Sequence, residues 1–132
     1  QDFKVTFSQP VQWVQDYIRD HFKALHHKSL VPDKEWGNLY SPRESSLSRH
    51  QINPWDLKNS PDYTCIYVVD MAKDSCELVI EYDDNRRQHN TWHVSLENNK
   101  VVIFPSTQRY FITSNNGSQM NVFLTFTYIY IE

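Results

Sequence analysis

The first regular pattern along the chain is an apolar stripe with a helical period between residues 8 and 27. Its apolar residues recur every three or four positions, as they do on one face of an α-helix. Ser8 suits the N-cap, Pro10 suits the first turn, and the pair His26–His27 suits the C-terminal end. The pattern predicts one amphipathic helix laid against a sheet, with Trp13 and Tyr17 widening its apolar face. The stripe consists of Val11, Val14, Ile18, Phe22 and Leu25, and the residues expected to face solvent are Gln12, Gln15, Asp16, Arg19 and Lys23.

From Trp36 onward the apolar positions follow a period of two, which is typical of β-strands. Turn-forming residues separate the strand-like runs: Asp83–Asn85, Asn98–Asn99 and Asn115–Ser118, of which the last is the strongest hairpin signal. The segment Gln51–Pro61, which contains two prolines, is predicted to be a loop. Short strands at this spacing predict a β-sandwich, a jelly roll or a barrel. The predicted strands are Trp36–Tyr40, Leu47–His50, Tyr63–Val69, Cys76–Tyr82, Thr91–Leu96, Val101–Phe104, Tyr110–Thr113 and Met120–Ile131.

Composition and charge exclude several classes of function. The chain has 132 residues, of which 14% are aromatic and only 2 are Gly, so it lacks the glycines of a phosphate-binding loop. With a net charge of -3 and a pI near 6.1, the chain lacks the basic surface field of a general nucleic-acid binder. No apolar run approaches the roughly 20 residues of a membrane span, and no signal-peptide pattern opens the chain. We expect neither a nucleic-acid nor a membrane partner. Because the chain starts at Gln1, we expect that residues before it have been removed.

The two cysteines are expected to be reduced and buried. If residues 70 and 75 face each other across a hairpin, Cys65 lies opposite Ile80, and Cys76 is then out of disulfide reach. Two free thiols are typical of an intracellular setting.

Several strands together carry a family resemblance. The runs Trp36–Tyr40, Ser48–His50, Tyr63–Val69, Val101–Ser106 and Asn121–Phe126 resemble the core of the 2-oxoglutarate/Fe(II) oxygenase superfamily, in order and spacing. The chain is most similar to small oxygenase-like proteins of tailed phages, particularly those of marine cyanobacteria. The resemblance implies a double-stranded β-helix, a form of jelly roll. The fold we expect is α+β and mainly β, in a single domain of residues 1–132. Residues 1–35 supply an N-terminal strand and the helix, and residues 36–132 supply the jelly-roll core.

The resemblance also assigns positions to a metal site, and most of these positions hold residues that are poor ligands for Fe(II). Such enzymes hold Fe(II) with two histidines and a carboxylate or third histidine on one face of the metal. His50 alone fits the first pair, because its partner position is either Ser48 or Ile52. The distal histidine position holds Tyr110, whose phenol is a poor substitute for neutral imidazole at pH 7.

The position of the arginine that grips the cosubstrate holds Asn121, which offers no charge and no two-pronged guanidinium. With one ligand remaining, the sequence predicts a catalytically silent member of the fold. No cofactor is then expected. Fe(II) and 2-oxoglutarate would be needed only by an active hydroxylase that uses His50 with other ligands.

Other histidines are better explained structurally. His89 and His93 fall on one face of a predicted strand and are expected to be edge-strand residues, and His26–His27 is expected to lie at a helix end.

Exposed aromatic residues allow binding functions. Trp55 and Trp92 would suit stacking on a sugar ring, which keeps carbohydrate recognition as an alternative. Tyr128 and Tyr130 extend a last strand that is apolar on both faces. That strand is either central and buried, or an open edge that invites pairing with another subunit.

Our main functional hypothesis is a non-enzymatic structural or protein-interaction component. The resemblance places it in a phage virion (tail, neck or baseplate) or its assembly, in the virion or the host cytoplasm. Its expected partners are other protein subunits, including further copies of itself. The alternatives are the atypical hydroxylase and the carbohydrate-binding jelly roll.

Overall fold

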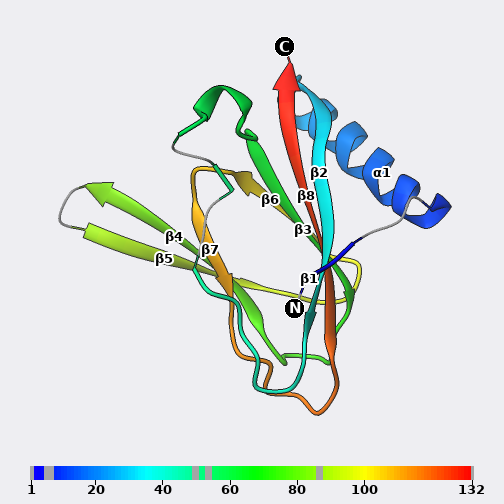
Figure 1. The fold of residues 1–132 in the computed structure, drawn as a ribbon, viewed down its shortest axis with the longest axis vertical. Coiled ribbons are helices and arrows are strands. Elements are labelled where there is room, and N and C mark those ends of the chain that lie inside the picture. The colour runs from blue at the N-terminus through cyan, green and yellow to red at the C-terminus, as the bar shows by residue number, and fades with distance from the viewer. Residues whose placement is uncertain (1, 5–7, 49–50, 53–54, 86–87, 132) are drawn as a thin grey trace.

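Two antiparallel sheets form the fold, and a single helix covers the outer face of the larger one (Figure 1). The computed structural model describes residues 2–4, 8–48, 51–52, 55–85 and 88–131, and for residues 82–85 and 88–89 the backbone alone. The larger sheet has the order β1-β2-β8-β3-β6, and the smaller has the order β5-β4-β7. The elements are β1 (Asp2–Phe3), α1 (Gln9–His26), β2 (Ser29–Tyr40), η1 (Leu57–Asn59), β3 (Tyr63–Asp70), β4 (Glu77–Asn85), β5 (Gln88–Ser95), β6 (Val101–Pro105), β7 (Arg109–Ile112) and β8 (Asn121–Ile131). This arrangement confirms the expected mainly β, jelly-roll architecture.

Helix α1 begins and ends where the sequence predicts. The Ser8 hydroxyl accepts a hydrogen bond from the Val11 amide at 3.5 Å, and Pro10 lies in the first turn. His27 closes the helix in the left-handed conformation with φ 58°, and its amide donates to the Lys23 carbonyl at 2.9 Å. No described helix is long and apolar enough to cross a membrane.

The buried face of α1 differs from the predicted one. Ile18 and Phe22 are buried as expected, but Gln15, which was predicted to face solvent, is also buried. Trp13 and Tyr17, predicted to widen the buried face, are instead 62% and 59% exposed. The helix is rotated this way because partners on the sheet satisfy the Gln15 amide: its Nε2 donates to Glu35, and its Oε1 accepts from the Tyr128 hydroxyl.

Most predicted strands are present, but some predicted connections are wrong. The run Asn115–Ser118 is no hairpin turn, because β7 pairs with β4 in the smaller sheet whereas β8 pairs in the larger. For the same reason β3 and β4 are not paired, so the predicted alignment of Cys65 with Ile80 is wrong. Both cysteines are nevertheless free and buried, as expected. Residues 47–48 are not in a strand, and the rest of the predicted strand Leu47–His50 lies outside the described residues.

Two other predicted turns have different outcomes. Asp83–Asn85 belongs to strand β4, so the turn expected there is wrong. Asn99 has φ 68°, which confirms the left-handed turn expected between β5 and β6.

Strand β8 is central. It pairs with β2 along its whole length and with β3 up to Tyr128. Tyr128 is wholly buried, and the Tyr130 amide donates to the Asp62 carboxylate at 3.0 Å. The open-edge alternative for this strand is therefore wrong.

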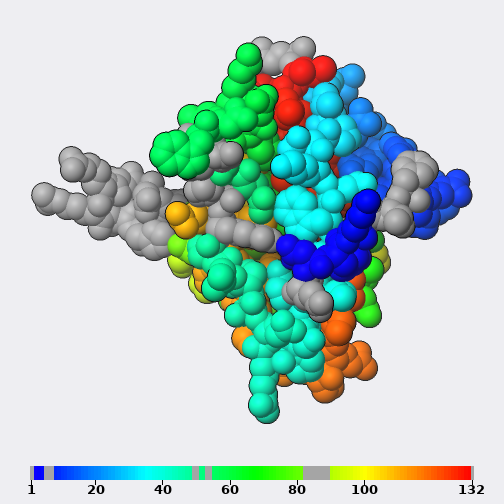
Figure 2. Space-filling view, viewed as in Figure 1, coloured from blue at the N-terminus to red at the C-terminus, as the bar shows by residue number. Residues whose placement is uncertain are grey.

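The buried side chains form two clusters, one on each face of the larger sheet. The inner cluster fills the space between the two sheets and includes Phe104, Tyr110 and Phe123. The outer cluster lies between the larger sheet and α1 and includes Phe22, Cys65 and Tyr128. At the end of the molecule away from α1, the segment 41–48 lies beside the loop of residues 113–120 (Figure 2). Backbone bonds join them, with the Arg43 amide donating to the Asn115 carbonyl at 2.6 Å.

Candidate functional site

Tyr110, which the resemblance assigns to the distal metal position, lies inside the space between the sheets. It is on β7 and only 2% exposed, and its ring packs edge-on against Phe104 with 5.1 Å between ring centroids. Its hydroxyl accepts a hydrogen bond from Nε2 of Gln51 at 2.8 Å. The ring and the hydroxyl are therefore both engaged with side chains of the protein itself.

Asn121, which the resemblance assigns to the cosubstrate clamp, begins β8 and has no exposed surface. Its Nδ2 donates to the Ser75 hydroxyl at 3.0 Å and to the Cys76 sulfur at 3.4 Å. Burial raises the pKa of the Cys76 thiol, and the hydrogen bond from Asn121 partly offsets this effect. The surroundings of Asn121 thus consist of neutral partners.

Buried apolar side chains lie along the strand that links these two positions. Tyr110 pairs with Ile80 on β4, whereas Asn121 contacts Cys76, the residue before that strand. Four residues of strand separate these contact points by roughly 13 Å. The inner cluster lies between them, and it includes Leu78, Ile80 and Ile112.

Two pairs of neutral polar side chains on the inner face of the larger sheet are also hydrogen-bonded to each other. The hydroxyls of Thr64 and Ser106 lie 2.8 Å apart, and the Thr125 hydroxyl donates to Oδ1 of Asn38 at 2.6 Å. All four residues are buried.

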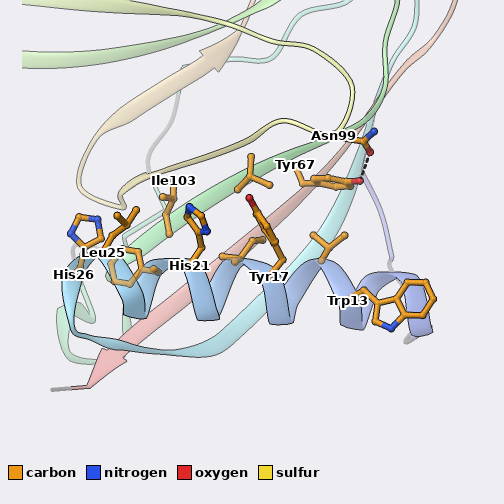
Figure 3. Close-up of a pocket in the computed structure, with 12 residues that line it drawn as sticks. Trp13, Tyr17, His21, Leu25, His26, Tyr67, Asn99 and Ile103 are labelled. Atoms are coloured by element: carbon orange, nitrogen blue, oxygen red, sulfur yellow. Dashed lines mark hydrogen bonds between the residues drawn. The ribbon is translucent and has the colours of Figure 1, made fainter.

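A separate groove lies on the outer face of the larger sheet, beside α1 (Figure 3). It has a volume of about 490 Å³. One wall is a row along α1, and the floor is formed by side chains of β3 and β6 with Asn99 at one end. In Figure 3, Tyr17 and His21 rise from the helix toward these strands, and the Tyr67 hydroxyl donates to Oδ1 of Asn99 at 2.9 Å. The lining of this groove is mainly apolar.

Comparisons with known proteins find likeness in structure only. No family model and no curated protein sequence matches the chain. A Pseudomonas putida prolyl-4-hydroxylase superposes with a TM-score of 0.67 at 13% identity, over 98% of this chain and 70% of that one. An oxidoreductase of the 2OG-Fe(II) oxygenase family from Burkholderia pseudomallei gives 0.65 at 10% identity, over 84% of this chain and 50% of that one.

A prolyl hydroxylase from Trichoplax adhaerens, solved with a peptide fragment of hypoxia inducible factor, gives 0.64 at 11% identity. The match covers 90% of this chain and 56% of that one. The chain therefore has the fold of the 2-oxoglutarate/Fe(II) oxygenases. It spans 50 to 70% of the length of these proteins. At identities this low, the likeness shows the fold alone.

Among the described residues, the two positions that the resemblance assigns to the metal and the cosubstrate do not fit these groups. Tyr110 offers a phenol already bound by an amide, and Asn121 offers no positive charge for a carboxylate. Ser48, one position considered for a second ligand, donates to the Glu81 carboxylate at 2.5 Å. Among the described residues no three His, Cys, Asp or Glu side chains gather around one point. His50 lies outside the described residues.

The remaining candidate residues lie on separate surfaces. Trp55 is 94% exposed in the loop before η1, and Trp92 is 60% exposed on β5, so both are accessible as the sugar-binding alternative requires. Tyr130 is half-buried, with the Lys28 ammonium 4.4 Å from its ring centroid. Tyr128 is buried beneath α1, so the prediction that it contacts a partner is wrong.

The histidines have structural positions. His93 lies on the edge strand β5, as expected, with its Nδ1 2.5 Å from the Glu77 carboxylate on the neighbouring strand. His26 ends α1 and packs against Phe22 with ring centroids 4.6 Å apart. The side chain of His89 is outside the described residues.

Sequence reasoning missed two features of these sites. Gln51, which directly follows His50, is the residue that meets Tyr110, and it lay in a segment interpreted only as a loop. The groove was missed because Trp13, Tyr17 and Leu25 were all assigned to the buried face of α1. The signal available was the width of the apolar face, which Trp13 and Tyr17 extend beyond the stripe of Val11, Val14, Ile18, Phe22 and Leu25.

Proposed function

We propose that this protein is a catalytically silent member of the oxygenase fold that acts by binding other proteins. The observation that carries the proposal is the burial and hydrogen bonding of the two positions that the resemblance assigns to the metal and the cosubstrate. Tyr110 and Asn121 are buried, neutral, and hydrogen-bonded to Gln51, Ser75 and Cys76.

Binding of 2-oxoglutarate by this fold needs a cation for its carboxylate, and Fe(II) needs convergent ligands with open positions. A buried amide that already donates to a hydroxyl and a thiol supplies neither charge nor free donors. The inner cluster supports the same proposal, because it packs buried apolar side chains around Tyr110 and around Cys76, the partner of Asn121. A role in protein interaction is supported by the apolar groove on the opposite face of the sheet. The phage virion or its assembly as the setting rests on the sequence resemblance alone.

The test is anaerobic binding of Fe(II) and 2-oxoglutarate to the full chain, followed by exposure to oxygen and measurement of succinate. We expect no saturable 2-oxoglutarate binding and no succinate above the buffer background. His50→Ala and Ser48→Ala are assayed as matched variants. Iron bound at one equivalent that is lost in His50→Ala, together with succinate formation, would overturn the proposal.

The second candidate is an Fe(II)- and 2-oxoglutarate-dependent hydroxylase with atypical ligands. The comparisons favour this candidate over a structural role, because the proteins of similar structure are described as oxygenases or hydroxylases. It requires His50 to act with ligands other than Tyr110 and Asn121. The same binding and succinate measurements decide between the two candidates.

A further inference from the structure

We propose that Asn116 and Gly117 form a covalent modification site, at which Asn116 loses its side-chain amide and becomes aspartate or isoaspartate. The buried neighbour Asn115 holds this site unreactive in the folded protein. The sequence contains a single Asn–Gly pair, and it lies in the run Asn115–Ser118 that was predicted to be a hairpin turn. The site belongs to the loop of residues 113–120 and does not depend on what the interior or the groove beside α1 binds.

The reaction needs only water and a base. The Gly117 backbone nitrogen gives its proton to hydroxide and attacks Cγ of Asn116, so that a nitrogen–carbon bond forms and a five-membered succinimide closes. The bond from Cγ to Nδ2 breaks, and the leaving amide takes a proton from water and departs as ammonia. Water then opens the succinimide at either carbonyl, which gives aspartate or isoaspartate. A glycine in the second position favours the attack, because it has no side chain to hinder the nitrogen and its backbone turns freely.

The carbon that is attacked is accessible. Asn116 is exposed and lines a hollow of about 400 Å³ together with Asp74 and Glu77. Its side chain makes no hydrogen bond to any residue that the structure describes, whereas its backbone amide donates to the Ser75 carbonyl at 2.9 Å. The side-chain amide is therefore open to water and free to leave.

The nitrogen that attacks is held by Asn115. The Gly117 amide donates to Oδ1 of Asn115 at 2.9 Å. Asn115 is only 1% exposed, and its Nδ2 donates to the carbonyls of Tyr40 at 3.0 Å and Gln119 at 2.7 Å. Because the attack requires the nitrogen to lose its proton and turn toward Asn116, the bond to Asn115 must break first.

The backbone on either side of the pair is also fixed. The Asn115 amide donates to the Glu44 carbonyl at 2.9 Å. Gly117 lies close to Ser75, since a Cβ atom on Gly117 would lie 3.3 Å from the Ser75 Cβ. Rotation of the peptide unit between Asn116 and Gly117 therefore requires the loop to open locally, and the reaction proceeds only from the small opened fraction.

The products would keep the loop open. Aspartate at position 116 adds a negative charge to a hollow whose lining already includes Asp74 and Glu77. Isoaspartate lengthens the backbone by one carbon atom and so displaces Gly117 from Oδ1 of Asn115. Either product weakens the bonds that hold this loop, and the change is irreversible without an enzyme.

The test compares the full chain in mildly alkaline buffer with the same chain in concentrated urea at the same pH. Peptide mapping by mass spectrometry follows aspartate and isoaspartate at position 116. We expect modification at least about tenfold slower in the folded chain, because the hydrogen bonds of Asn115 and Gly117 must break before the attack. No modification in urea would show that the pair is not a site, and equal rates with and without urea would overturn the protection.

Variants assign the protection to Asn115. In the folded chain, Asn115→Ala should speed the modification at least about fivefold, because it removes the acceptor of the Gly117 amide. Ser114→Ala, at the exposed residue on the other side of Asn115, should leave the rate unchanged. Equal rates in these two variants, both shown by circular dichroism to be folded, would overturn the role of Asn115.

Amide hydrogen exchange of the unaltered protein tests the same bond without a substitution, should Asn115→Ala fail to fold. The Gly117 amide should exchange at least about tenfold more slowly in the folded chain than in urea, after correction for the intrinsic rate. Exchange of the Gly117 amide at the unprotected rate would overturn the proposal.

Discussion

The hydroxyl of Tyr128, on the central strand β8, donates a hydrogen bond to Oε1 of Gln15 on helix α1 inside the protein. Gln15 in turn donates from Nε2 to the Glu35 carboxylate of β2 at 3.0 Å. Both ends of the Gln15 amide are thus used, and they join α1 to the next strand, β2, and to the distant strand β8. This network fixes which face of α1 turns toward the sheet, and so leaves Trp13 and Tyr17 exposed at the groove beside α1.

We predict that Tyr128→Phe lowers the free energy of unfolding by about 1 to 3 kcal/mol, because it leaves the buried Gln15 oxygen without its donor. Urea unfolding followed by circular dichroism measures the change. Tyr17→Phe is the matched control: Tyr17 is 59% exposed, and its loss of a hydroxyl should cost less than about 0.5 kcal/mol. Equal effects of the two substitutions would contradict the assigned role of Tyr128.

Gln15 also shows what the sequence could and could not predict about the fold. Hydrophobic periodicity located α1 and the strands, because spacing of apolar residues is a local property of the chain. The rotation of α1 depended instead on a bond to Tyr128, 113 residues away. The connections after β3 and β7 were misread for a similar reason, since a turn sequence does not indicate whether the next strand stays in the same sheet.

Cys65 should make stability fall at alkaline pH. Its thiol is fully buried, and burial raises its pKa. Above about pH 8.5 the unfolded chain loses this proton while the folded protein keeps it, so the folded state is destabilised by up to about 1.4 kcal/mol per pH unit. Cys65→Ala should remove that slope between about pH 9 and pH 10, whatever its effect at neutral pH. Urea unfolding at a series of pH values measures both slopes, and parallel slopes would contradict the prediction.

Asn121→Arg tests whether the interior can accept the cosubstrate clamp. Asn121 has no exposed surface and its partners Ser75 and Cys76 are neutral, so a guanidinium placed there is buried without a carboxylate. We expect a loss of about 3 to 5 kcal/mol in unfolding free energy. The exposed substitution Asn116→Arg should change it by less than about 0.5 kcal/mol.

Added 2-oxoglutarate extends this test. If the interior is filled, millimolar 2-oxoglutarate leaves the melting temperature of the Asn121→Arg variant unchanged. An increase in melting temperature in that variant but not in Asn116→Arg would show that the dianion reaches the new cation, and would favour the hydroxylase candidate.

The candidate site was only partly predictable from the sequence. The family resemblance assigned Tyr110 and Asn121 to positions inside the jelly roll, and the structure shows both residues buried there. Their partners Gln51, Ser75 and Cys76 come from other strands or loops, and no local pattern links them. The groove beside α1 could not be predicted for a different reason, since it depends on how much of the sheet one helix covers.

The final prediction concerns Phe3, whose ring lies over Gly37 where β1 pairs with β2. A Cβ atom at Gly37 would lie 1.9 Å from the end of the Phe3 ring, so Gly37→Ala must displace that side chain. Because the ring is flexible and 36% exposed, β1 should detach without unfolding the protein, at a cost of about 1 kcal/mol. In a Phe3→Ala background the same substitution should be neutral or slightly stabilising, because Ala restricts the unfolded chain more than Gly does. A double-mutant cycle by urea unfolding should therefore give a coupling energy of about 1 kcal/mol, whereas additive effects would show that the ring does not cover Gly37 in solution.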